Sequence, residues 1–564
     1  MLKRWLIKKP NPQLQVKLSN ALNIHPVVAQ LLINRNVTDA EEAQSFLNCT
    51  LSRLHDPFLL KDMDRAVERL RRAKQRGELV LIYGDYDLDG VTASALLRRL
   101  CGRLQIPAVN YIPHRLDEGY GLNENVVEYA QAQGVGLVVT VDCGINAFAP
   151  IDALQKNGID VIVVDHHHPD ENRLPAAFAV INPKRPDCSY PFKHLSAVGL
   201  VAKLVQAALG HLPEDELDLV ALGTIADVVP LVGENRIFVK QGLPHLEQTK
   251  KHGLMALLET AKIKGKKMKP SFVGFILGPR INAAGRMDSA AASLELLLSE
   301  DNTAALILAQ HLEARNQERQ RLQSAMVEEA IALIEREINF KDHQIIVVHK
   351  EGWHKGVLGI VASRIVEKYY RPTVVISVDN GFATGSARSI EGFHLFEALT
   401  HCSPLFENFG GHKRAAGLRL RGEHIEQFRD TINAFARQVL TPEHLLPTLS
   451  LDGELDLAHV NMDLVQAMDQ LEPYGEENPP PLFCSRGLKV KSPPVVLGKG
   501  TLKFWVTDGV NTVSAVGFGM AEYQDMVQLG QEVDLAYSLT IDDWNKKPTA
   551  QLRLKDIRLS DHLK

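Results

Sequence analysis

Between residues 79 and 230 the chain alternates short apolar runs with segments of helical periodicity. Five runs each end in a polar or turn residue, as buried strands do: LVLIYGD, AVNYIPH, GLVVTVDCG, DVIVVDHHH and FAVINP. The segments VTASALLRRLCGRL, NENVVEYAQAQG and INAFAPIDALQKNG repeat apolar residues at helical spacing. This alternation is typical of βαβ units with right-handed crossovers on a parallel sheet. The sequence therefore predicts an open α/β domain in the first half.

The chain of 564 residues exceeds the roughly 250–300 residues that one hydrophobic core accommodates, so we expect several domains. The segment from Asn302 to Ile338 keeps a helical period without Gly or Pro, which predicts a long connecting helix. Beyond it, HQIIVVHK and PTVVISV flank the helical pattern GVLGIVASRIVEKYY. A second α/β lobe is therefore expected.

The last part of the chain changes texture after about residue 447. Its segments LKVKS, PVVLGKG, TLKFWVTD, NTVSAVGFG, VDLAYSLTID and AQLRLKDIRL alternate apolar with polar residues and predict a small β-barrel of the OB type. The predicted fold class is α/β: two α/β lobes joined by a long helix, with a C-terminal OB-like β-barrel. The predicted domains are a mostly helical N-terminal extension (1–45), a catalytic domain (46–250), a connecting segment (251–340), a second lobe (341–445) and the barrel (446–564).

Composition excludes several classes of protein. The net charge of −5 does not itself call for a polyanionic partner, so any nucleic-acid surface must be local. No apolar run reaches the roughly 18 residues of a membrane span, and charge breaks the apolar stretch of MLKRWLIKKPNP before it can form an export signal. Six cysteines lie far apart without a C-x-x-C pair. We expect a reduced, cytoplasmic protein without a membrane partner.

Carboxylates and imidazoles follow the predicted strands where each strand ends. They are Asp85, Asp87, Asp89, Asp142, Asp165, His166, His167 and His168, with Asp227 at a later helix-to-loop junction. Because ligands bind at the carboxyl ends of parallel strands, these side chains should converge. A single D-x-D-G is most often a turn and a single histidine pair most often a loop or cap. Their joint placement at successive strand ends favours a site.

Several carboxylates at close range repel one another unless they share protons or bind cations. Oxygen ligands with one or two imidazoles and no thiolate suit Mn²⁺ or Mg²⁺, and suit Zn²⁺ less well. One carboxylate that bridges two such ions would hold a water for in-line attack on phosphorus. We therefore predict two divalent cations as cofactors.

The motifs DYDLDG, VDCGI, VDHHHP and GTIADVVPL resemble, in order and spacing, those of the DHH phosphoesterases. In the second half, GPRINAAGRMDSA, GWHKGVLGIVASRI, GSARSIEGFHL and FGGHKRAAG resemble the DHHA1 domain of the RecJ branch of that family. The resemblance covers roughly residues 45 to 560. It implies a DHH domain in the first lobe and a DHHA1 domain in the second, whose motif at 278–286 lies in the connector.

The resemblance also implies roles for the strand-end residues. Asp87 and Asp142 would hold one ion, completed by Asp85, where this chain has Tyr83 in place of the histidine of many small-substrate relatives. Asp89, Asp142, His166 and Asp227 would hold the second ion, with Asp142 as the bridge. His167 would face the phosphate as a proton donor, Asp165 would orient the histidine pair, and His168 is interpreted as structural.

Cationic groups must face such metals, because cleavage of a phosphodiester depends on neutralising charge. The expected phosphate-binding residues are His114, Arg115, Arg280, Asn282, Arg286, Ser386, Arg388 and His412. Of these, the resemblance assigns Arg280, Ser386 and Arg388 to a terminal 5′ phosphate, with Gly285 and Gly385 letting backbone amides come close. In the barrel, Phe504, Trp505 and Trp544 are candidates for stacking bases.

The sequence thus predicts a metal-dependent 5′-to-3′ exonuclease that hydrolyses single-stranded DNA to mononucleotides in DNA repair and recombination. A helicase and a single-strand-binding protein are expected to cooperate with it, and the chain is expected to be a monomer. One alternative is a DHH phosphodiesterase that acts on short oligonucleotides or on cyclic or linear dinucleotides. A second alternative is a non-catalytic replication scaffold, although such a scaffold would have lost its carboxylates.

Overall fold

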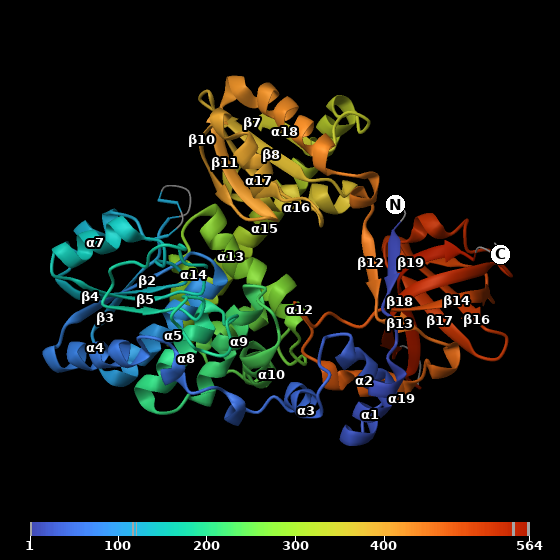
Figure 1. Cartoon of the computed structure of the whole chain (residues 1–564), viewed down its shortest axis with the longest axis horizontal. Coiled ribbons are helices and arrows are strands. Elements are labelled where there is room, and N and C mark those ends of the chain that lie inside the picture. Colours follow the sequence, from blue (N-terminus) through green and yellow to red (C-terminus); the bar gives the residue numbers. More distant parts are fainter. Residues whose placement is uncertain (1–2, 115–117, 120, 544–546, 561–564) are drawn as a thin grey trace. The chain divides into compact units, whose positions relative to one another are not determined.

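The computed structural model describes residues 3–114, 118–119, 121–543 and 547–560. The chain divides into two compact units (Figure 1), each built from separate stretches of the sequence. We call residues 1–54, 228–241 and 448–564 the barrel unit. The two-sheet unit comprises residues 55–227 and 242–447.

The first sheet of the two-sheet unit is entirely parallel, with strand order β3-β2-β4-β5-β6. Its strands are β2 (Leu79–Gly84), β3 (Ala108–Tyr111), β4 (Val135–Val141), β5 (Asp160–Val164) and β6 (Ala179–Ile181). These strands are nearly continuous apolar runs because helices cover both faces of the sheet. The predicted open α/β domain is confirmed.

Helices of the first lobe lie on the two faces of this sheet. They are α4 (Met63–Arg76), α5 (Leu88–Leu104), α6 (Asn125–Ala132), α7 (Phe148–Lys156), α8 (Ala197–Leu209) and α9 (Leu217–Ala226). Val126 of α6 and Ile151 of α7 share a core with Leu81 and Val138 of the sheet. Helices α5 and α8 instead contact the sheet at β2 and β4, and α9 packs outside them against both.

A run of helices follows, made of α10 (Gly233–Glu247), α11 (His252–Thr260), α12 (Pro270–Phe272), α13 (Gly278–Met287), α14 (Ala291–Leu298) and the long α15 (Asn302–Glu337). A π-helical turn, Val273–Leu277, joins α12 to α13. The predicted connecting helix is confirmed. Residues 278–286 lie in α13, and a Cβ on Gly285 would lie 3.0 Å from the Tyr86 carbonyl oxygen. Gly285 therefore serves close packing.

The second sheet has the order β10-β11-β9-β8-β7. Its strands are β7 (Ile346–Glu351), β8 (Thr373–Asp379), β9 (Phe382–Arg388), β10 (Phe406–Gly411) and β11 (Ala415–Arg421), and its helices are α16 (Leu358–Tyr369), α17 (Leu395–His401) and α18 (Ile425–Val439). Only β7 and β8 pair in parallel, so this lobe is a mixed sheet. Gly385 lies inside β9, where a Cβ would meet Leu418 Cδ1 at 2.9 Å.

The barrel unit contains a ring of five strands that closes where β14 pairs with β16. Its strands are β12 (Thr448–Leu451), β13 (Gly453–Glu454), β14 (Phe483–Val490), β15 (Val495–Leu497), β16 (Thr501–Thr507), β17 (Thr512–Gly517), β18 (Glu532–Asp542) and β19 (Thr549–Leu559), and α19 spans Met462–Met468. Around the ring the order is β14-β16-β17-β19-β18, with β17 and β19 parallel. The predicted OB-type barrel is confirmed.

The first residues of the chain belong to this barrel unit, whereas the sequence suggested a separate extension. They form β1 (Arg4–Ile7), α1 (Pro12–Leu22), α2 (Pro26–Ile33) and α3 (Ala40–Asn48). Strand β1 pairs in parallel with β12, and Leu18 and Leu32 share one core with barrel residues such as Leu535. Sequence periodicity could not show this, because the pairing joins residues more than 440 positions apart.

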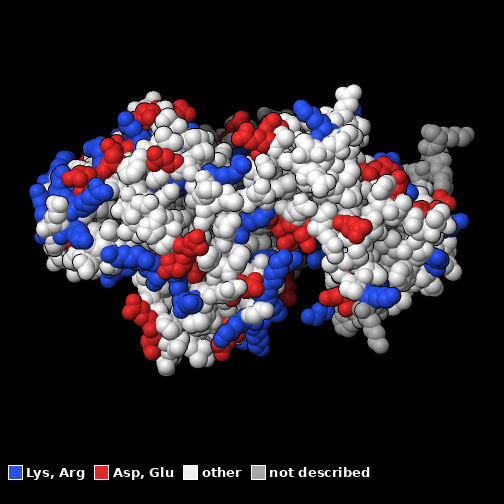
Figure 2. Space-filling model, turned by 90° about the horizontal axis from the view of Figure 1, so that it is seen from below, with Lys and Arg blue, Asp and Glu red and all other residues white. Residues whose placement is uncertain are grey.

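Neither sign of charge dominates the face of the molecule that Figure 2 shows. Figure 2 shows Lys and Arg interspersed with Asp and Glu across the face in view, as the net charge of −5 suggests. No helix in the described part of the chain is both long and apolar enough to span a membrane.

Candidate metal centre and phosphate site

Three aspartates stand in register, each one residue beyond a parallel strand. Asp85 follows β2, Asp142 follows β4 and Asp165 follows β5. Each donates its backbone N–H to the carbonyl oxygen of the last residue of the neighbouring strand. The acceptors are Val141 O at 3.3 Å, Val164 O at 3.0 Å and Ile181 O at 3.1 Å, respectively. The parallel ladder therefore places the three carboxylates side by side along one edge of the sheet.

The strand-end residues converge into groups whose ligand atoms lie within 4.8 Å of one another. The groups are Asp85 with Asp87 and Asp142, Asp89 with His166 and Asp227, and Asp142 with His166 and His167. Asp142 connects them, because its Oδ1 lies 3.2 Å from Nε2 of His166, which in turn lies 3.6 Å from Oδ2 of Asp227. The convergence expected from the sequence is thus present in the structure.

Backbone geometry holds these carboxylates in place. Asp87 caps α5 and accepts hydrogen bonds from the amides of Asp89 (2.9 Å) and Gly90 (3.1 Å). Gly90 permits the tight turn, because a Cβ there would lie 2.5 Å from the Asp85 carbonyl oxygen. Asp142 adopts φ of 63°, a left-handed conformation that L-residues take rarely and that Asp and Asn take more readily than most.

Helix ends supply the second half of the cluster. Asp89 accepts hydrogen bonds from the amides of Ala197 (2.7 Å) and Val198 (2.9 Å), which open α8. Asp227 directly follows α9, as expected for a helix-to-loop junction. The positive end of α8 thus stabilises one of the acids that the cluster gathers.

The electrostatics of the cluster favour a bound cation. Burial, and then the charge of Asp87, raise the pKa of Asp89 to about 7. Burial and neighbouring aspartates also raise the pKa of Asp142 and of Asp227 well above the ordinary value. Among the residues described, buried Asp227 Oδ2 and His166 Nε2 make no hydrogen bond. Buried oxygen and imidazole donors of this kind, left without hydrogen-bond partners, fit Mn²⁺ or Mg²⁺.

The two histidines of the DHH motif differ in charge. Burial, and then the neighbouring His167, lower the pKa of His166 to about 3, so its ring is neutral and able to ligate a metal. Burial would lower the pKa of His167, but its bond to Asp165 outweighs burial and raises it. His167 Nδ1 lies 2.7 Å from Asp165 Oδ1, and Ile145 N donates to Asp165 Oδ2 at 3.0 Å. Among the described contacts Asp165 orients His167 and not both histidines.

The sequence analysis missed a lysine beside this cluster. Lys184 is half-buried; burial lowers its pKa, and Asp227 and Asp165 act on it in the opposite direction. Asn182 fixes the segment, because its Nδ2 donates to His167 O at 2.8 Å while its Oδ1 accepts from Lys184 N at 2.7 Å. Both residues follow β6, so the strand-end rule that located the aspartates also applied here.

Three of the expected phosphate-binding residues meet at the start of α16. Ser386 and Arg388 are two residues apart on β9, so their side chains face the same side of the sheet, and Arg388 Nη1 donates to Ser386 Oγ at 3.3 Å. A Cβ on Gly359 of α16 would lie 2.7 Å from Arg388 Nη2 and 3.0 Å from Ser386 Oγ. Arg286 also reaches this region, with Nη1 3.5 Å from Gly356 O. Guanidinium groups at a helix N-terminus form a suitable anion site.

The remaining expected residues are more scattered. Arg280 and Asn282 both lie on α13. Arg280 Nε is 2.6 Å from Glu313 Oε2 of α15, and Oδ1 of Asn282 is buried. His412 lies in the β10–β11 turn. Burial, followed by Lys184 and then His412, lowers the pKa of His168. The amide of His114 donates to Glu118 Oε1 at 2.7 Å. Arg115 lies outside the described residues.

The barrel candidates separate by burial. Phe504 is 1% exposed and fills the core, so its expected role in stacking is wrong, whereas its neighbour Trp505 is 43% exposed. Phe518 is also exposed, with the Arg553 guanidinium 5.1 Å from its ring centre. Trp544 lies outside the described residues.

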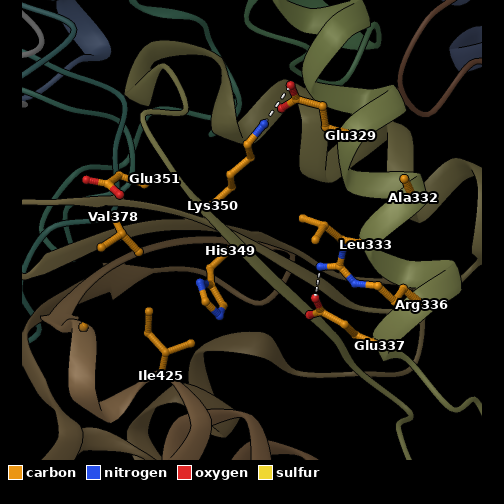
Figure 3. A pocket seen from close by; sticks show the side chains of 11 residues that line it. Glu329, Ala332, Leu333, Arg336, Glu337, His349, Lys350, Glu351, Val378 and Ile425 are labelled. Carbon is orange, nitrogen blue, oxygen red and sulfur yellow. Dashed lines mark hydrogen bonds and ion pairs between the residues drawn. The ribbon is translucent and has the colours of Figure 1, made fainter.

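A cavity of about 710 Å³ lies elsewhere in the two-sheet unit, between α15, β7 and α18 (Figure 3). Four of its charged groups form two ion pairs, Lys350 with Glu329 at 2.9 Å and Arg336 with Glu337 at 2.6 Å. None of its lining residues belongs to the metal or phosphate groups. We therefore place no part of the site there.

Comparison with known proteins gives three family matches in chain order. Residues 79–224 match the DHH family N-terminal domain, 342–438 the DHHA1 domain and 451–556 the RecJ OB domain. The chain is 38% identical over 561 residues to the single-stranded-DNA-specific exonuclease RecJ of Bacillus subtilis, covering 99% of this chain and 71% of the relative. It is 35% identical to that of Escherichia coli, covering 94% and 96%.

Two solved structures are similar to the chain over nearly its whole length. The crystal structure of RecJ in complex with Mn²⁺ from Thermus thermophilus is similar with a TM-score of 0.85 and 31% identity, over 100% of this chain and 80% of that one. The Mg²⁺ complex from the same organism gives 0.79 and 29%, over 99% and 79%.

Proposed function

The chain belongs to the RecJ family of single-stranded-DNA-specific exonucleases, and from this premise we propose that it degrades single-stranded DNA from the 5′ end to mononucleotides. The enzyme is a metal-dependent hydrolase. The observation that carries the proposal is the convergence of Asp85, Asp87, Asp89, Asp142, His166 and Asp227 in one buried cluster. We propose that the enzyme acts in DNA repair and recombination.

The ligand groups divide between two cations. Asp85, Asp87 and Asp142 would hold one, and Asp89, His166 and Asp227 would hold the other together with Asp142. Asp142 suits a bridge, because it groups with Asp85 and Asp87 and its Oδ1 lies 3.2 Å from His166 Nε2. When bound, a pair of divalent cations supplies an activated water and neutralises charge on the phosphate. Asp142 is the residue whose loss would affect both.

The protein's own groups complete the chemistry. Asp165 holds His167 by Nδ1, which directs the other ring nitrogen away from that carboxylate and supports its role as donor to the phosphate or the leaving oxygen. Lys184 adds a positive charge near Asp227 and Asp165. Both groups favour the more negative phosphate of the transition state.

Direction would come from a 5′-terminal phosphate held by Ser386, Arg388 and Arg286 at the start of α16. Arg280, Asn282, His114, Arg115 and His412 remain proposed substrate contacts. Arg280 would have to exchange its ion pair with Glu313 for a phosphate. In the barrel, exposed Trp505 and Phe518 would stack bases.

We also propose the compartment in which the protein acts and the proteins that cooperate with it. All six cysteines are buried and free, which supports a reducing cytoplasm. We propose a monomer that receives single strands from a helicase and a single-strand-binding protein. The relation to single-strand exonucleases over nearly the whole chain favours this function over a dinucleotide phosphodiesterase and over a non-catalytic scaffold.

The test uses a 5′-phosphorylated single strand labelled at either end, with Mn²⁺. We expect labelled mononucleotide from the 5′ end first, no cleavage by Asp142→Asn, and retained strand binding by that variant. Asp152→Asn, on the exposed side of α7, is the matched control and should cleave normally. Release from the 3′ end, equal degradation of a duplex, or preference for a dinucleotide would overturn the proposal.

A further inference from the structure

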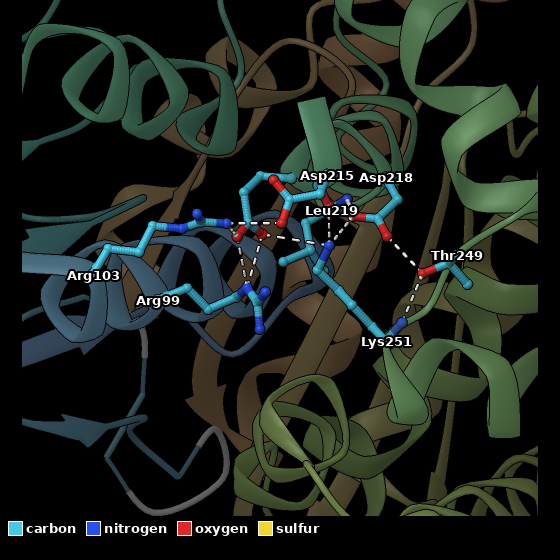
Figure 4. A network of polar contacts seen from close by, with 8 residues as sticks. Arg99, Arg103, Asp215, Asp218, Leu219, Thr249 and Lys251 are labelled. Carbon is cyan, nitrogen blue, oxygen red and sulfur yellow. Dashed lines mark hydrogen bonds and ion pairs between the residues drawn. The ribbon is translucent and has the colours of Figure 1, made fainter. Parts of the chain in front are cut away.

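A buried ionic cluster joins α5 to α9 inside the two-sheet unit (Figure 4). It comprises Arg99 and Arg103 of α5, Glu216 and Asp218 at the start of α9, and Lys251 just before α11. Glu216 and Asp218 are 1% and 2% exposed. We call it the register cluster.

Its contacts are dense and charge-assisted. Arg99 Nε donates to both carboxylate oxygens of Glu216, at 2.9 and 2.8 Å, and Arg103 Nη2 donates to Glu216 Oε1 at 2.8 Å. Lys251 Nζ donates to Asp218 Oδ1 at 2.7 Å and lies 3.4 Å from Glu216 Oε2. Thr249 Oγ1 donates to Asp218 Oδ2 at 2.7 Å. Each buried acid is therefore satisfied by partners on other elements.

Glu216 stays ionised at neutral pH. Burial would raise the pKa of Glu216, but Lys251, Arg99 and Arg103 together outweigh burial and lower it below the ordinary value. A buried carboxylate of this kind tolerates little displacement, because losing one partner leaves a charge in a site from which water is excluded.

Beside the cluster lies a cavity of about 560 Å³, lined in part by Arg99, Asp218 and Lys251. The charges of these three residues are already paired within the cluster. We therefore interpret the cluster as a structural junction and not as a ligand site.

The other end of the same helix pair carries the metal cluster. Asp87 and Asp89 begin α5, and Asp227 ends α9. The helices meet there closely, because a Cβ on Gly223 would lie 2.2 Å from Thr92 Oγ1 and 3.0 Å from Asp89 Oδ1. Helices α5 and α9 are thus antiparallel, with the register cluster at one end and the acids at the other.

The distances along the two helices match. Asp89 and Arg99 are ten residues apart, and Glu216 and Asp227 are eleven, which at 1.5 Å per residue are about 15 and 16 Å. A slip of α9 by one residue would move Asp227 by about 1.5 Å relative to Asp89 and would break the bonds to Glu216. We propose that the register cluster fixes the axial position of α9 against α5, so that Glu216 and its partners act as positioning residues for the metal ligands.

This inference rests on the proposed function, and its test is Glu216→Gln, which keeps the shape and removes the charge. We expect the Mn²⁺ concentration for half-maximal cleavage of a single strand, and the Mn²⁺ dissociation constant from calorimetry, to rise about tenfold. The maximal rate at saturating Mn²⁺ and the KM for DNA should stay near wild type. A role confined to stability would instead lower the active fraction at every Mn²⁺ concentration.

The matched control is Glu259→Gln, which removes an exposed ion pair with Lys264 and should leave Mn²⁺ dependence unchanged. If Glu216→Gln does not fold, Arg103→Gln decides, because its side chain is 39% exposed and Glu216 keeps Arg99 and Lys251. A folded variant with wild-type Mn²⁺ affinity overturns the inference. A wild-type chain that neither binds Mn²⁺ nor cleaves DNA would instead overturn the proposed function.

Discussion

Substitution of Gly223 by alanine tests how tightly α9 must pack beside the metal cluster. The added Cβ would lie 2.2 Å from Thr92 Oγ1, 2.8 Å from Val198 Cγ1 and 3.0 Å from Asp89 Oδ1. The threonine hydroxyl cannot easily move away, because it donates to Leu88 O at 2.7 Å and to Asp89 O at 3.0 Å. The new methyl group must therefore push α9 away from α5.

The expected magnitude follows from two opposed contributions. Forcing a methyl group into a packed core costs about 1–3 kcal/mol. Alanine in place of glycine inside a helix gains about 1 kcal/mol. The net free energy of unfolding should fall by up to about 2 kcal/mol, and the Mn²⁺ requirement for cleavage should rise because Asp227 moves relative to Asp89.

Urea unfolding followed by circular dichroism, together with Mn²⁺ titration of nuclease activity, measures both effects. The control is Gly102→Ala in α5, where a Cβ would meet nothing within 4 Å, so this variant should gain about 0.5–1 kcal/mol. Adding Thr92→Ala to Gly223→Ala should recover part of the loss through a coupling between the two sites. The reasoning is refuted if Gly223→Ala gains stability as Gly102→Ala does, with unchanged Mn²⁺ dependence.

Three further outcomes are expected. The pKa of Glu216 in the folded protein lies below the ordinary value of 4.5, so the ionised carboxylate stabilises the fold fully above about pH 4.5 and this stabilisation is lost as the pH falls through the folded-state pKa. The melting temperature of Glu216→Gln should therefore fall less steeply below pH 4.5 than that of the wild type. Trp505→Ala should weaken single-strand binding by about 1–3 kcal/mol without unfolding the barrel, whereas Phe504→Ala should destabilise it by about 3–5 kcal/mol; equal effects of the two in binding and melting experiments would contradict the assignment. Arg388→Ala should reduce the ratio of cleavage rates on 5′-phosphorylated and 5′-hydroxyl strands, and an equal loss on both would argue against its role.

Local sequence pattern was sufficient for the strand-end aspartates. Asp85, Asp142 and Asp165 each follow an apolar run, and parallel strands in register bring such residues to one edge of a sheet whatever the rest of the chain does. The same rule covered Lys184 after β6, which was overlooked because a lysine after a strand is usually a solvated loop residue. Burial next to Asp227 distinguishes it, and burial is not visible in a single sequence.

Sequence also suggested the barrel but not which aromatic residue faces outward. Phe504 and Trp505 are adjacent, so strand alternation requires that one be buried and the other exposed, yet the choice depends on which face closes the ring with β14. In the same way, GPRINAAGR contains two glycines and a proline that suggest a loop. These residues instead form α13, with the proline in the first turn, where it is compatible with a helix, and with Gly285 packed against Tyr86.

The sequence by itself determined the α/β class, the long helix, the barrel and the list of acids and histidines, because periodicity and strand-end position are local properties. Only the tertiary structure decided that Glu216, over 120 positions from Asp89, helps to hold α5 and α9 in register, and that the first strand completes a pairing with β12. Such contacts join residues that share no local pattern. They arise from side chains that must be neutralised or buried once the helices and sheets have packed.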